Sequence, residues 1–452
     1  MRNPAIIALT GLLVSVVANS SAAKEEAIVT PRDDCEPSWS AFPSQPDSYV
    51  DALCVFDDGA GEAMYVGGYF EFIGDTYFGH IAQWDGEQWS PLGDGLDGKV
   101  RCMTVFDDGS GPALFVGGEF TVAGGQPASN IAKWNGSGWV ALSSGVSGTV
   151  IGLGVYDAEE GPVLLVSGDF LEAGGLPARR LATWDGTQWA PFGPGLNAPA
   201  RQFVEFDDGS GPALYVAGDF TTVGDMTAKR IVRFDGQEWT PLHYNDEYGF
   251  NSRVDGVLVH DDGNGFAMFV AGQFTQAFGI SVGRVARWDG KNWTPVGLGT
   301  SSRIRSMVLC DLGQGPEIYI GGMFLYADQY LARYIARWDG KRWNPVGFGL
   351  SDSVWELCAW QRDGSPALYV GGWFEEAGGK PAPNLATWGG CAVQPPACPG
   401  DVNQDSHINL QDLNLVLSNF GTTSDTGDAN NDGEVDLQDL NLVLSRFGES
   451  CV

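Results

Sequence analysis

Short runs in which apolar and polar residues alternate recur along most of this chain. Residues 100–106 read VRCMTVF and are followed by a turn sequence, DDGSGP. Residues 113–120 (ALFVGGEF) form a second run, and a longer loop, TVAGGQPASN, leads to IAKW at 131–134. The short NGS turn before GWVAL at 138–142 is a hairpin signal. The pattern predicts a unit of four strands, named A to D in chain order.

This unit recurs along the chain, with successive copies fifty residues apart except for one step of fifty-four. Seven strand–turn units predict an all-β, seven-bladed β-propeller of four-stranded blades. The glycines at 117–118 are expected to let neighbouring sheets approach closely. The repeated aromatic residues are Phe70, Phe120, Phe170, Phe220, Phe274, Phe324 and Phe374 at the end of strand B, Trp84, Trp134, Trp184, Phe234, Trp288, Trp338 and Trp388 in strand C, and Trp39, Trp89, Trp139, Trp189, Trp239, Trp293 and Trp343 in strand D.

The repeat begins out of phase, because the sequence around Trp39 is a D strand that precedes the first A strand. The last unit, which ends near Trp388, has strands A, B and C but no D strand. We therefore expect the N-terminal strand to complete the last blade, which closes the ring and removes both sheet edges. Cys35 and Cys391 would then fall in the same C–D turn, and we predict a disulfide between them. In the chain-entropy description, a disulfide that closes a loop of this length stabilises the folded state by about 5 kcal/mol.

Four further cysteines lie on or near the predicted innermost strands. Cys54 and Cys358 match in position on the first and last blades, so a second closure bond is possible, and Cys102 competes for Cys54. Cys310 has no evident partner in the sequence and is expected to be buried.

The double glycine that ends strand B, together with the Trp of strand D, resembles the Kelch-type propellers over residues 35–391. The tyrosine and charged positions of that family's strand C are not reproduced. The resemblance implies an architecture and not an activity.

Two loops near the C-terminus place oxygen-bearing side chains at alternate positions. The sequences are GDVNQDSHINLQDLNLVLSNFG and GDANNDGEVDLQDLNLVLSRFG. Ca²⁺ requires six or more oxygens converging from one short loop, and this spacing matches positions 1, 3, 5, 7, 9 and 12 of an EF-hand loop. Two calcium ions are therefore expected, with His407 and Glu434 contributing backbone carbonyls. The predicted ligands are Asp401, Asn403, Asp405, His407, Asn409 and Asp412 in the first loop and Asp428, Asn430, Asp432, Glu434, Asp436 and Asp439 in the second.

A duplicated loop–helix unit with Asp at position 12 resembles a type I dockerin over residues 399–450. The resemblance implies a small calcium-folded module that docks onto a cohesin-like receptor domain of a scaffold or cell surface. Leucines stand where better-known dockerins carry hydroxyl pairs, which leaves the receptor type open, and periodicity alone does not decide whether Leu410 and Leu417 are exposed. Cys398 and Cys451 bracket the module, and a disulfide between them would join its ends. The resemblance places the partner contacts at Leu410, Gln411, Leu417, Ser418, Leu437, Gln438, Leu444 and Ser445.

The N-terminus reads as a secretory signal, with Arg2, an apolar run at 5–17 and small residues at 21–23. Secretion is therefore expected, to the extracellular space or the cell surface, and no later segment is apolar enough to insert into a membrane. The formal charge of −32 argues against nucleic acid or an anionic membrane as a partner and suits divalent cations. The expected organisation is a signal peptide at 1–23, an extension at 24–34, the propeller at 35–391, a linker at 392–398 and the dockerin-like domain at 399–452.

Strand alternation places the longer B–C and D–A loops on one face, which includes the insertion near 243–251. Aromatic rings stack on sugars and arginines hold carboxylates, so a polysaccharide is a sensible ligand for this face, and a protein ligand is the other option. The alternative is that the arginines pair with nearby acids. The DDG turns on the opposite face are read as turn chemistry, not calcium sites. The candidate ligand residues are Tyr77, Phe78, Arg180, Arg230, Tyr244, Tyr248, Arg284, Tyr330 and Tyr334.

The chain contains four histidines and neither a G-x-S-x-G nor an H-E-x-x-H motif. The first hypothesis is accordingly a secreted, non-enzymatic binding protein docked to a scaffold. The alternative is a glycoside hydrolase or lyase, and two carboxyl groups about 5–10 Å apart in a deep pocket would favour it.

Overall fold

The computed structural model describes residues 37–244, 247–362, 364–389, 402, 408–422, 435 and 437–447. They fall into two compact units, a large one within Cys35–Val393 and a small one within Gln394–Val452, and each is described by itself.

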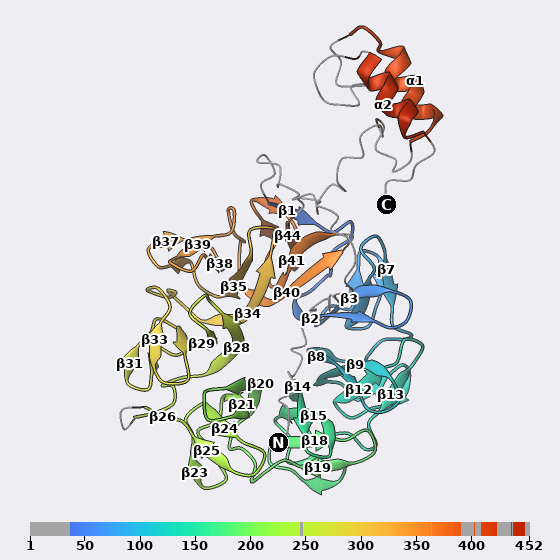
Figure 1. Cartoon of the computed structure of the whole chain (residues 1–452). Helices are drawn as coiled ribbons and strands as arrows, with labels where there is room; N and C mark the ends of the chain where they lie inside the picture. The colour runs from blue at the N-terminus through green and yellow to red at the C-terminus, as the bar shows by residue number, and fades with distance from the viewer. Residues whose placement is uncertain are drawn as a thin grey trace, which may run out of the picture. The chain divides into compact units, whose positions relative to one another are not determined.

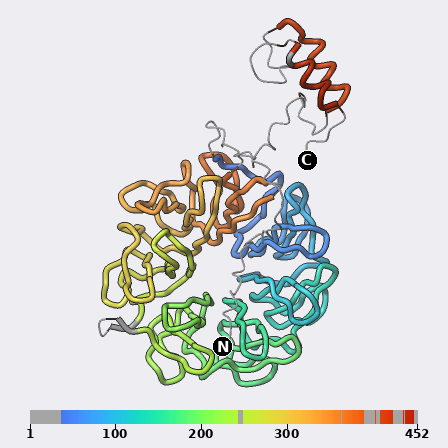
Figure 2. Tube along the Cα trace, in the orientation of Figure 1, coloured from blue at the N-terminus to red at the C-terminus, as the bar shows by residue number. Residues whose placement is uncertain are grey.

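The large unit is a ring of seven four-stranded antiparallel blades, as the repeat predicts (Figures 1 and 2). The innermost strands are β2 (Val50–Asp57), β8 (Lys99–Asp107), β14 (Val150–Ala158), β20 (Ala200–Asp207), β28 (Val254–Asp261), β34 (Ile304–Asp311) and β40 (Val354–Arg362). The second strands are β3 (Glu62–Gly68), β9 (Pro112–Glu119), β15 (Gly161–Gly168), β21 (Pro212–Gly218), β29 (Phe266–Gly272), β35 (Pro316–Gly322) and β41 (Ser365–Gly372). The third strands are β6 (Ile81–Trp84), β12 (Ile131–Trp134), β18 (Leu181–Trp184), β24 (Ile231–Phe234), β32 (Val285–Trp288), β38 (Ile335–Trp338) and β44 (Leu385–Gly389). The outer strands are β7 (Trp89–Pro91), β13 (Trp139–Ala141), β19 (Trp189–Pro191), β25 (Trp239–Pro241), β33 (Trp293–Pro295), β39 (Trp343–Pro345) and β1 (Ser38–Ala41).

The ring closes through β1, which pairs antiparallel with β44 and places Trp39 opposite Trp388. The two indole rings lie 5.2 Å apart, and Nε1 of Trp39 donates to the carbonyl of Val346 at 3.3 Å. The prediction that the first ordered strand completes the last blade is confirmed. The expected Cys35–Cys391 bond and the signal sequence at 1–23 lie outside the described residues.

The double glycines allow two different close approaches. A Cβ on Gly117 would lie 2.4 Å from Cγ1 of Val150 on the next blade, which confirms the predicted contact between sheets. A Cβ on Gly118 would instead lie 2.0 Å from the carbonyl oxygen of Lys99 on its own blade. The first glycine therefore serves packing between blades, and the second serves pairing within one blade.

Each B–C loop contains a two-stranded hairpin that the sequence analysis treated as an irregular loop. In the second blade Gly124 and Gly125 form its turn with φ of +55° and +74°, a conformation that suits the right-handed twist of hairpins. A bridge from Leu96 to Ala123 ties the hairpin to the D–A loop, so this face is braced. The hairpins are β4/β5 (Phe72–Ile73, Thr76–Tyr77), β10/β11 (Val122–Ala123, Gln126–Pro127), β16/β17 (Glu172–Ala173, Leu176–Pro177), β22/β23 (Thr222–Val223, Met226–Thr227), β30/β31 (Gln276–Ala277, Ile280–Ser281), β36/β37 (Tyr326–Ala327, Tyr330–Leu331) and β42/β43 (Glu376–Ala377, Lys380–Pro381), and a further pair, β26/β27 (His243–Tyr244, Glu247–Tyr248), lies in the insertion.

The apolar core lies between adjacent blades. Tyr65 on β3 shares one buried cluster with Leu114 and Val116 on β9 of the next blade. The Trp pairs of the C and D strands, such as Trp134 and Trp139 at 5.5 Å, join the same clusters. Because the core is distributed around the ring, the strand ends at the axis are left to carry polar side chains.

The small unit contains two helices of identical sequence, α1 (Leu410–Ser418) and α2 (Leu437–Ser445). Ile408, Val416, Val435 and Val443 form their shared buried core. Among the residues described, no helix has both the length and the apolar character needed to cross a membrane.

Candidate functional site

The predicted ligand residues on the outer loops differ in accessibility. Tyr77 on β5 and Tyr330 on β37 are exposed, whereas Phe78 is 3% exposed and packs against Trp89. The structure thus places Phe78 in the core and not on the ligand face. Tyr244 and Tyr248 belong to the β26/β27 pair, and their side chains lie outside the description.

Arg180, Arg230, Arg284 and Tyr334 occupy one repeat position, and all four have φ between 64° and 76°. Their backbone groups continue the pairing between strands B and C, so this position is primarily a structural one. The guanidinium groups reach Asp169 at 3.7 Å (Arg180), the Asp219 carbonyl (Arg230) and the Thr300 carbonyl (Arg284). The arginines therefore brace this face, but only Arg180 does so through an acidic side chain, as the alternative to ligand binding expected of all of them.

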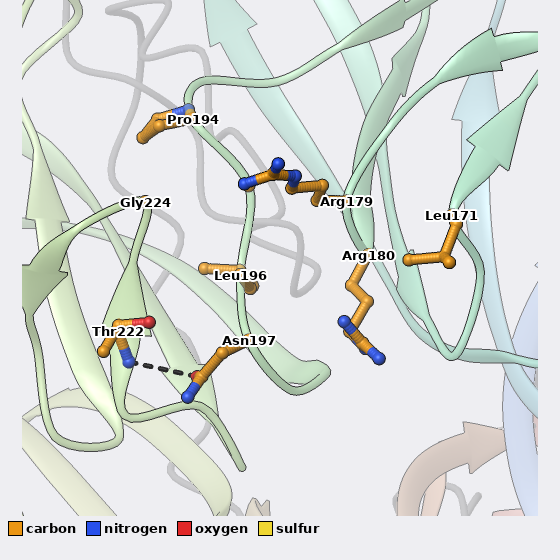
Figure 3. Close-up of a pocket in the computed structure, with 9 residues that line it drawn as sticks. Leu171, Arg179, Arg180, Pro194, Leu196, Asn197, Thr222 and Gly224 are labelled. Carbon is orange, nitrogen blue, oxygen red and sulfur yellow. Dashed lines mark hydrogen bonds between the residues drawn. The ribbon is translucent and has the colours of Figure 1, made fainter.

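A side pocket of about 280 Å³ contains one of these residues (Figure 3). Arg179 and Arg180 project from one loop, and Asn197 Oδ1 accepts a hydrogen bond from the backbone N–H of Thr222 at 3.0 Å. The pocket lining contains no carboxylate and no aromatic residue to complement the arginines.

The DDG turns use their carboxylates internally. Oδ1 of Asp107 accepts from the N–H groups of Gly109 and Gly111 at 2.9 and 3.0 Å, and the turns that begin at Asp57, Asp207, Asp261 and Asp311 repeat this pattern. The prediction that these aspartates serve turn geometry is confirmed.

A larger cavity, of about 550 Å³, is lined by residues of the innermost strands, and we call it the axial pocket. Each innermost strand carries a β-bulge at the same repeat position near its start, and a bulge redirects a side chain out of the regular alternation. The bulge residues all line the axial pocket, and they are Asp51, Arg101, Ile151, Arg201, Asp255, Arg305 and Trp355. Because these strands start from the D–A loops, the mouth of the pocket lies on the face predicted to bind ligand.

One charge cluster surrounds Asp51, which is 7% exposed. Arg101 Nη1 donates to its Oδ2 at 2.7 Å, and Arg305 Nη2 donates to its Oδ1 at 3.3 Å. Burial raises the pKa of Asp51, and the two arginines oppose that rise. Arg305 is itself desolvated, which lowers its pKa to about 10.

A second cluster surrounds Asp255, which is 5% exposed. Arg303 holds it with two hydrogen bonds, at 2.6 and 2.9 Å, while Arg253 and Arg201 lie 3.7 and 3.8 Å from its Oδ1. Arg201 and Arg253 share a second carboxylate, that of Asp219, at 3.0 and 3.2 Å. Three guanidinium groups thus face two carboxylates.

Glu356 lies on β40 within the axial pocket. Its Oε1 accepts from Ser306 Oγ at 2.8 Å and from the Leu357 N–H at 3.2 Å. Burial raises the pKa of Glu356 to about 7, although these hydrogen bonds and Arg305 favour the ionised form. It is a carboxyl group that changes protonation near neutral pH.

Aromatic side chains flank the pocket where the first and last blades meet. Trp355 lines the pocket, and the Arg305 guanidinium lies 4.3 Å from the centre of its ring. Tyr49 packs on Trp355 at 4.3 Å and on Tyr69 and Trp373 at 5.3 and 5.8 Å. Tyr69 and Trp373 are 46% and 51% exposed, so the cluster extends from the pocket into solvent.

The axial pocket was not predicted, because the sequence of the innermost strands predicts side chains that alternate regularly between two faces. A signal was present, since Asp51, Arg101, Arg201, Asp255 and Arg305 are charged residues at one repeat position of otherwise apolar strands. The bulge that turns them toward the axis has no evident sequence signature in the strands themselves.

The cysteines of the innermost strands are thiols. Cys54, Cys102, Cys310 and Cys358 are unpaired with one another, so the possible second closure bond is not formed. Burial raises the pKa of Cys54 to about 12 and that of Cys310 to about 12, which makes both thiols poor nucleophiles.

Three of the predicted calcium ligands are described, namely Asn409, Asp412 and Asp439. Asp412 is fully buried, and its two oxygens accept from the N–H groups of Val402 and Asn409 at 2.8 and 2.9 Å. These contacts hold loop positions 2 and 9 against the carboxylate at position 12, and the contact with Asn409 is part of a capping box at the start of α1. Asp439 is equally buried. The described residues contain no cluster of three potential metal-binding side chains, and the other predicted ligands, together with Cys398 and Cys451, lie outside them.

The predicted partner-binding leucines are exposed, which periodicity alone did not decide. Leu410 and Leu417 are 64% and 52% exposed on α1, and Leu437 and Leu444 are 62% and 50% exposed on α2.

No family model matches this chain, and no curated protein matches it. Among solved structures, the chain is similar to one described as BBS1N in complex with ARL6DN, soaked with mercury, with 11% identity and a TM-score of 0.44 over 78% of this chain and 97% of that one. A similarity of that size supports no argument about function.

Proposed function

We propose that this chain is a secreted, non-enzymatic binding protein that holds a polysaccharide in the axial pocket and is attached to a scaffold or cell surface through its C-terminal unit. The observation that carries the proposal is that the seven bulge residues all line one cavity of about 550 Å³, within the usual range for ligand sites. A protein ligand would need a broader surface than this cavity offers.

The attachment rests on the C-terminal unit. The spacing of its ligands, the buried carboxylates of Asp412 and Asp439 and the exposed leucines on both helices support a calcium-dependent dockerin that binds a cohesin-like domain. Because α1 and α2 have the same sequence, either helix could face the receptor.

A glycoside hydrolase is the second candidate, because Glu356 has the raised pKa of a general acid and senses the nearby charge of Asp51. It is less well supported because Asp51 and Asp255 are held by arginines, which leaves neither placed to activate water or attack a sugar.

A glycan-array screen of the full chain in calcium, paired with a reducing-sugar assay, tests the proposal. We expect retention of saccharides that Trp355→Ala weakens, without release of reducing ends. Sugar release that is lost in Glu356→Gln would establish the enzyme instead. Retention of no glycan at all would remove the proposal.

A further inference from the structure

The aromatic cluster contacts the charge cluster around Asp51, and the cluster around Asp255 lines the same axial pocket. Trp355 contacts Arg305 on one side and Tyr49 on the other, and Tyr49 leads to the exposed rings of Tyr69 and Trp373. These contacts place apolar ring faces beside the guanidinium group of Arg305.

The cluster around Asp255 has unused capacity for hydrogen bonding. Nε of Arg253 is buried, and although it is 3.2 Å from Asp219 Oδ1, it makes no hydrogen bond with any described residue. Within the described part of the chain, the terminal nitrogens of Arg201 and Arg253 also donate to no acceptor. The terminal nitrogens are not among the buried donors, and both arginines line the axial pocket, so these nitrogens are open to an acceptor on a ligand.

The electrostatics of the same cluster favour an anion. Desolvation lowers the pKa of Arg253, the charges of Arg201 and Arg303 lower it further, and Asp255 and Asp219 oppose the shift. Because three guanidinium groups face these two carboxylates, one positive charge of the cluster has no matching carboxylate. This is local, because the chain as a whole has a formal charge of −32. An oxyanion is the species that complements a guanidinium fork, since it accepts two parallel hydrogen bonds.

We infer that the axial pocket binds an acidic saccharide chain, with a sugar ring on the aromatic cluster and a carboxylate or sulfate group of the same chain on Arg253 and Arg201. The inference rests on the proposed binding function and specifies its ligand class. The aromatic faces account for a pyranose ring, and the unused donors account for the acidic group. An acidic peptide would satisfy the arginines but gives no role to the exposed rings of Tyr69 and Trp373.

The test uses the full chain in calcium and isothermal titration with four probes. These are a trisaccharide of galacturonate, its full methyl ester, a sulfated galactose trisaccharide and a peptide of six glutamates. We expect the affinity for either acidic saccharide to be at least about tenfold higher than the affinity for the methyl ester, because the ester loses the charge-assisted hydrogen bonds. Comparing acid with ester on the unaltered protein requires no variant to fold.

Variants then locate the site. Arg253→Gln is expected to lower the affinity for acidic saccharides by about tenfold or more and to leave the affinity for the ester unchanged. Trp373→Ala should weaken acid and ester alike. Arg179→Gln, which removes an arginine from the side pocket of Figure 3, is the matched control and should bind as the unaltered chain does.

The outcomes separate this inference from the function on which it rests. Equal binding of acid and ester, lost in Trp373→Ala and kept in Arg253→Gln, would overturn the acidic class and leave saccharide binding intact. Binding of the glutamate peptide alone would overturn the saccharide. Absence of binding by every probe and every neutral glycan would overturn both.

Discussion

At the scale of single residues, the seven similar units carry different kinds of side chain where the innermost strand bulges. The residue before each bulge packs between blades and is Val, Ile or Ala, because the neighbouring sheet leaves space for little else, as between Val150 and Gly117. The bulge residue faces the axis, so packing does not restrict it. It is Asp, Arg, Ile or Trp in different blades, and the resulting mixture of charge and aromatic surface forms the site.

Glu356→Gln tests the electrostatics of the pocket. A carboxyl group whose pKa rises from its usual 4.5 to about 7 on folding binds a proton more tightly in the folded state. The stabilisation that this proton gives to the folded state is complete below pH 4.5 and is lost as pH rises through 7. Glu356 should therefore contribute a fall of about 1–2 kcal/mol to the free energy of unfolding between pH 5 and pH 8, after allowance for partial solvent screening. Urea titrations should show that fall reduced in Glu356→Gln and unchanged in the exposed control Glu375→Gln.

Gly118→Ala tests the close approach within a blade. A Cβ there would lie 2.0 Å from a backbone oxygen, which cannot move without disturbing strand pairing, so we expect a loss of about 1–3 kcal/mol in unfolding free energy. Gly138 has no atom within 4 Å of an added Cβ and is the matched control. A change of less than about 0.5 kcal/mol in Gly118→Ala, as expected for Gly138→Ala, would contradict this account.

At the scale of elements, β1 is the outer strand of the last blade, although it lies at the N-terminal end of the propeller sequence. In the other six blades the outer strand directly follows the third strand in the sequence. Trp39 is 7% exposed, packs against Trp388 and donates a hydrogen bond to the preceding blade. Trp139, Trp189 and Trp343 make the equivalent bond, so closure uses the same contact that joins adjacent blades.

Removing the ring of Trp39 should therefore weaken the packing of β1 against β44 and against the preceding blade. We expect Trp39→Ala to lower the free energy of unfolding by about 3–5 kcal/mol, since it deletes a buried aromatic side chain and its hydrogen bond. Ser40→Ala, an exposed change on the same strand, should stay within about 0.5 kcal/mol. Denaturant unfolding followed by tryptophan fluorescence measures both. Equal stability of the two variants would show that β1 adds no strength to the ring.

At the scale of the whole molecule, the chain joins two units with different sources of stability. The propeller has continuous apolar clusters between its blades. Among the described residues of the C-terminal unit, the buried side chains are Ile408, Val416, Val435 and Val443 and the carboxylates Asp412 and Asp439. A core this small is rarely sufficient without a metal or a disulfide.

Removing calcium should accordingly unfold one unit and spare the other. Hydrogen exchange followed by mass spectrometry should show that chelation removes protection from the amides of α1 and α2, while β2 and β8 remain protected, because metal binding is coupled to folding. Magnesium in place of calcium is the control and should restore less protection. Unchanged protection of both helices after chelation would contradict a calcium-folded unit.

The sequence by itself determined the number of blades, the strands within them and the closing role of β1. It could do so because a fifty-residue period, the alternation of 100–106 and the position of Trp39 are local properties repeated seven times. It also located the DDG turns, whose geometry depends on neighbouring residues alone. The Gly124–Gly125 hairpin was within its reach as well, since a glycine pair is a local signal.

Only the tertiary structure assembled the axial pocket. Asp51 and Arg305 are 254 residues apart, and they meet because the ring brings the first and sixth blades to a common axis. The bulges turn these residues inward while Arg180, Arg230 and Arg284, which looked more promising, brace their own loops. A repeated local pattern fixes how each blade is built, whereas a shared axis exists only once all seven blades have closed.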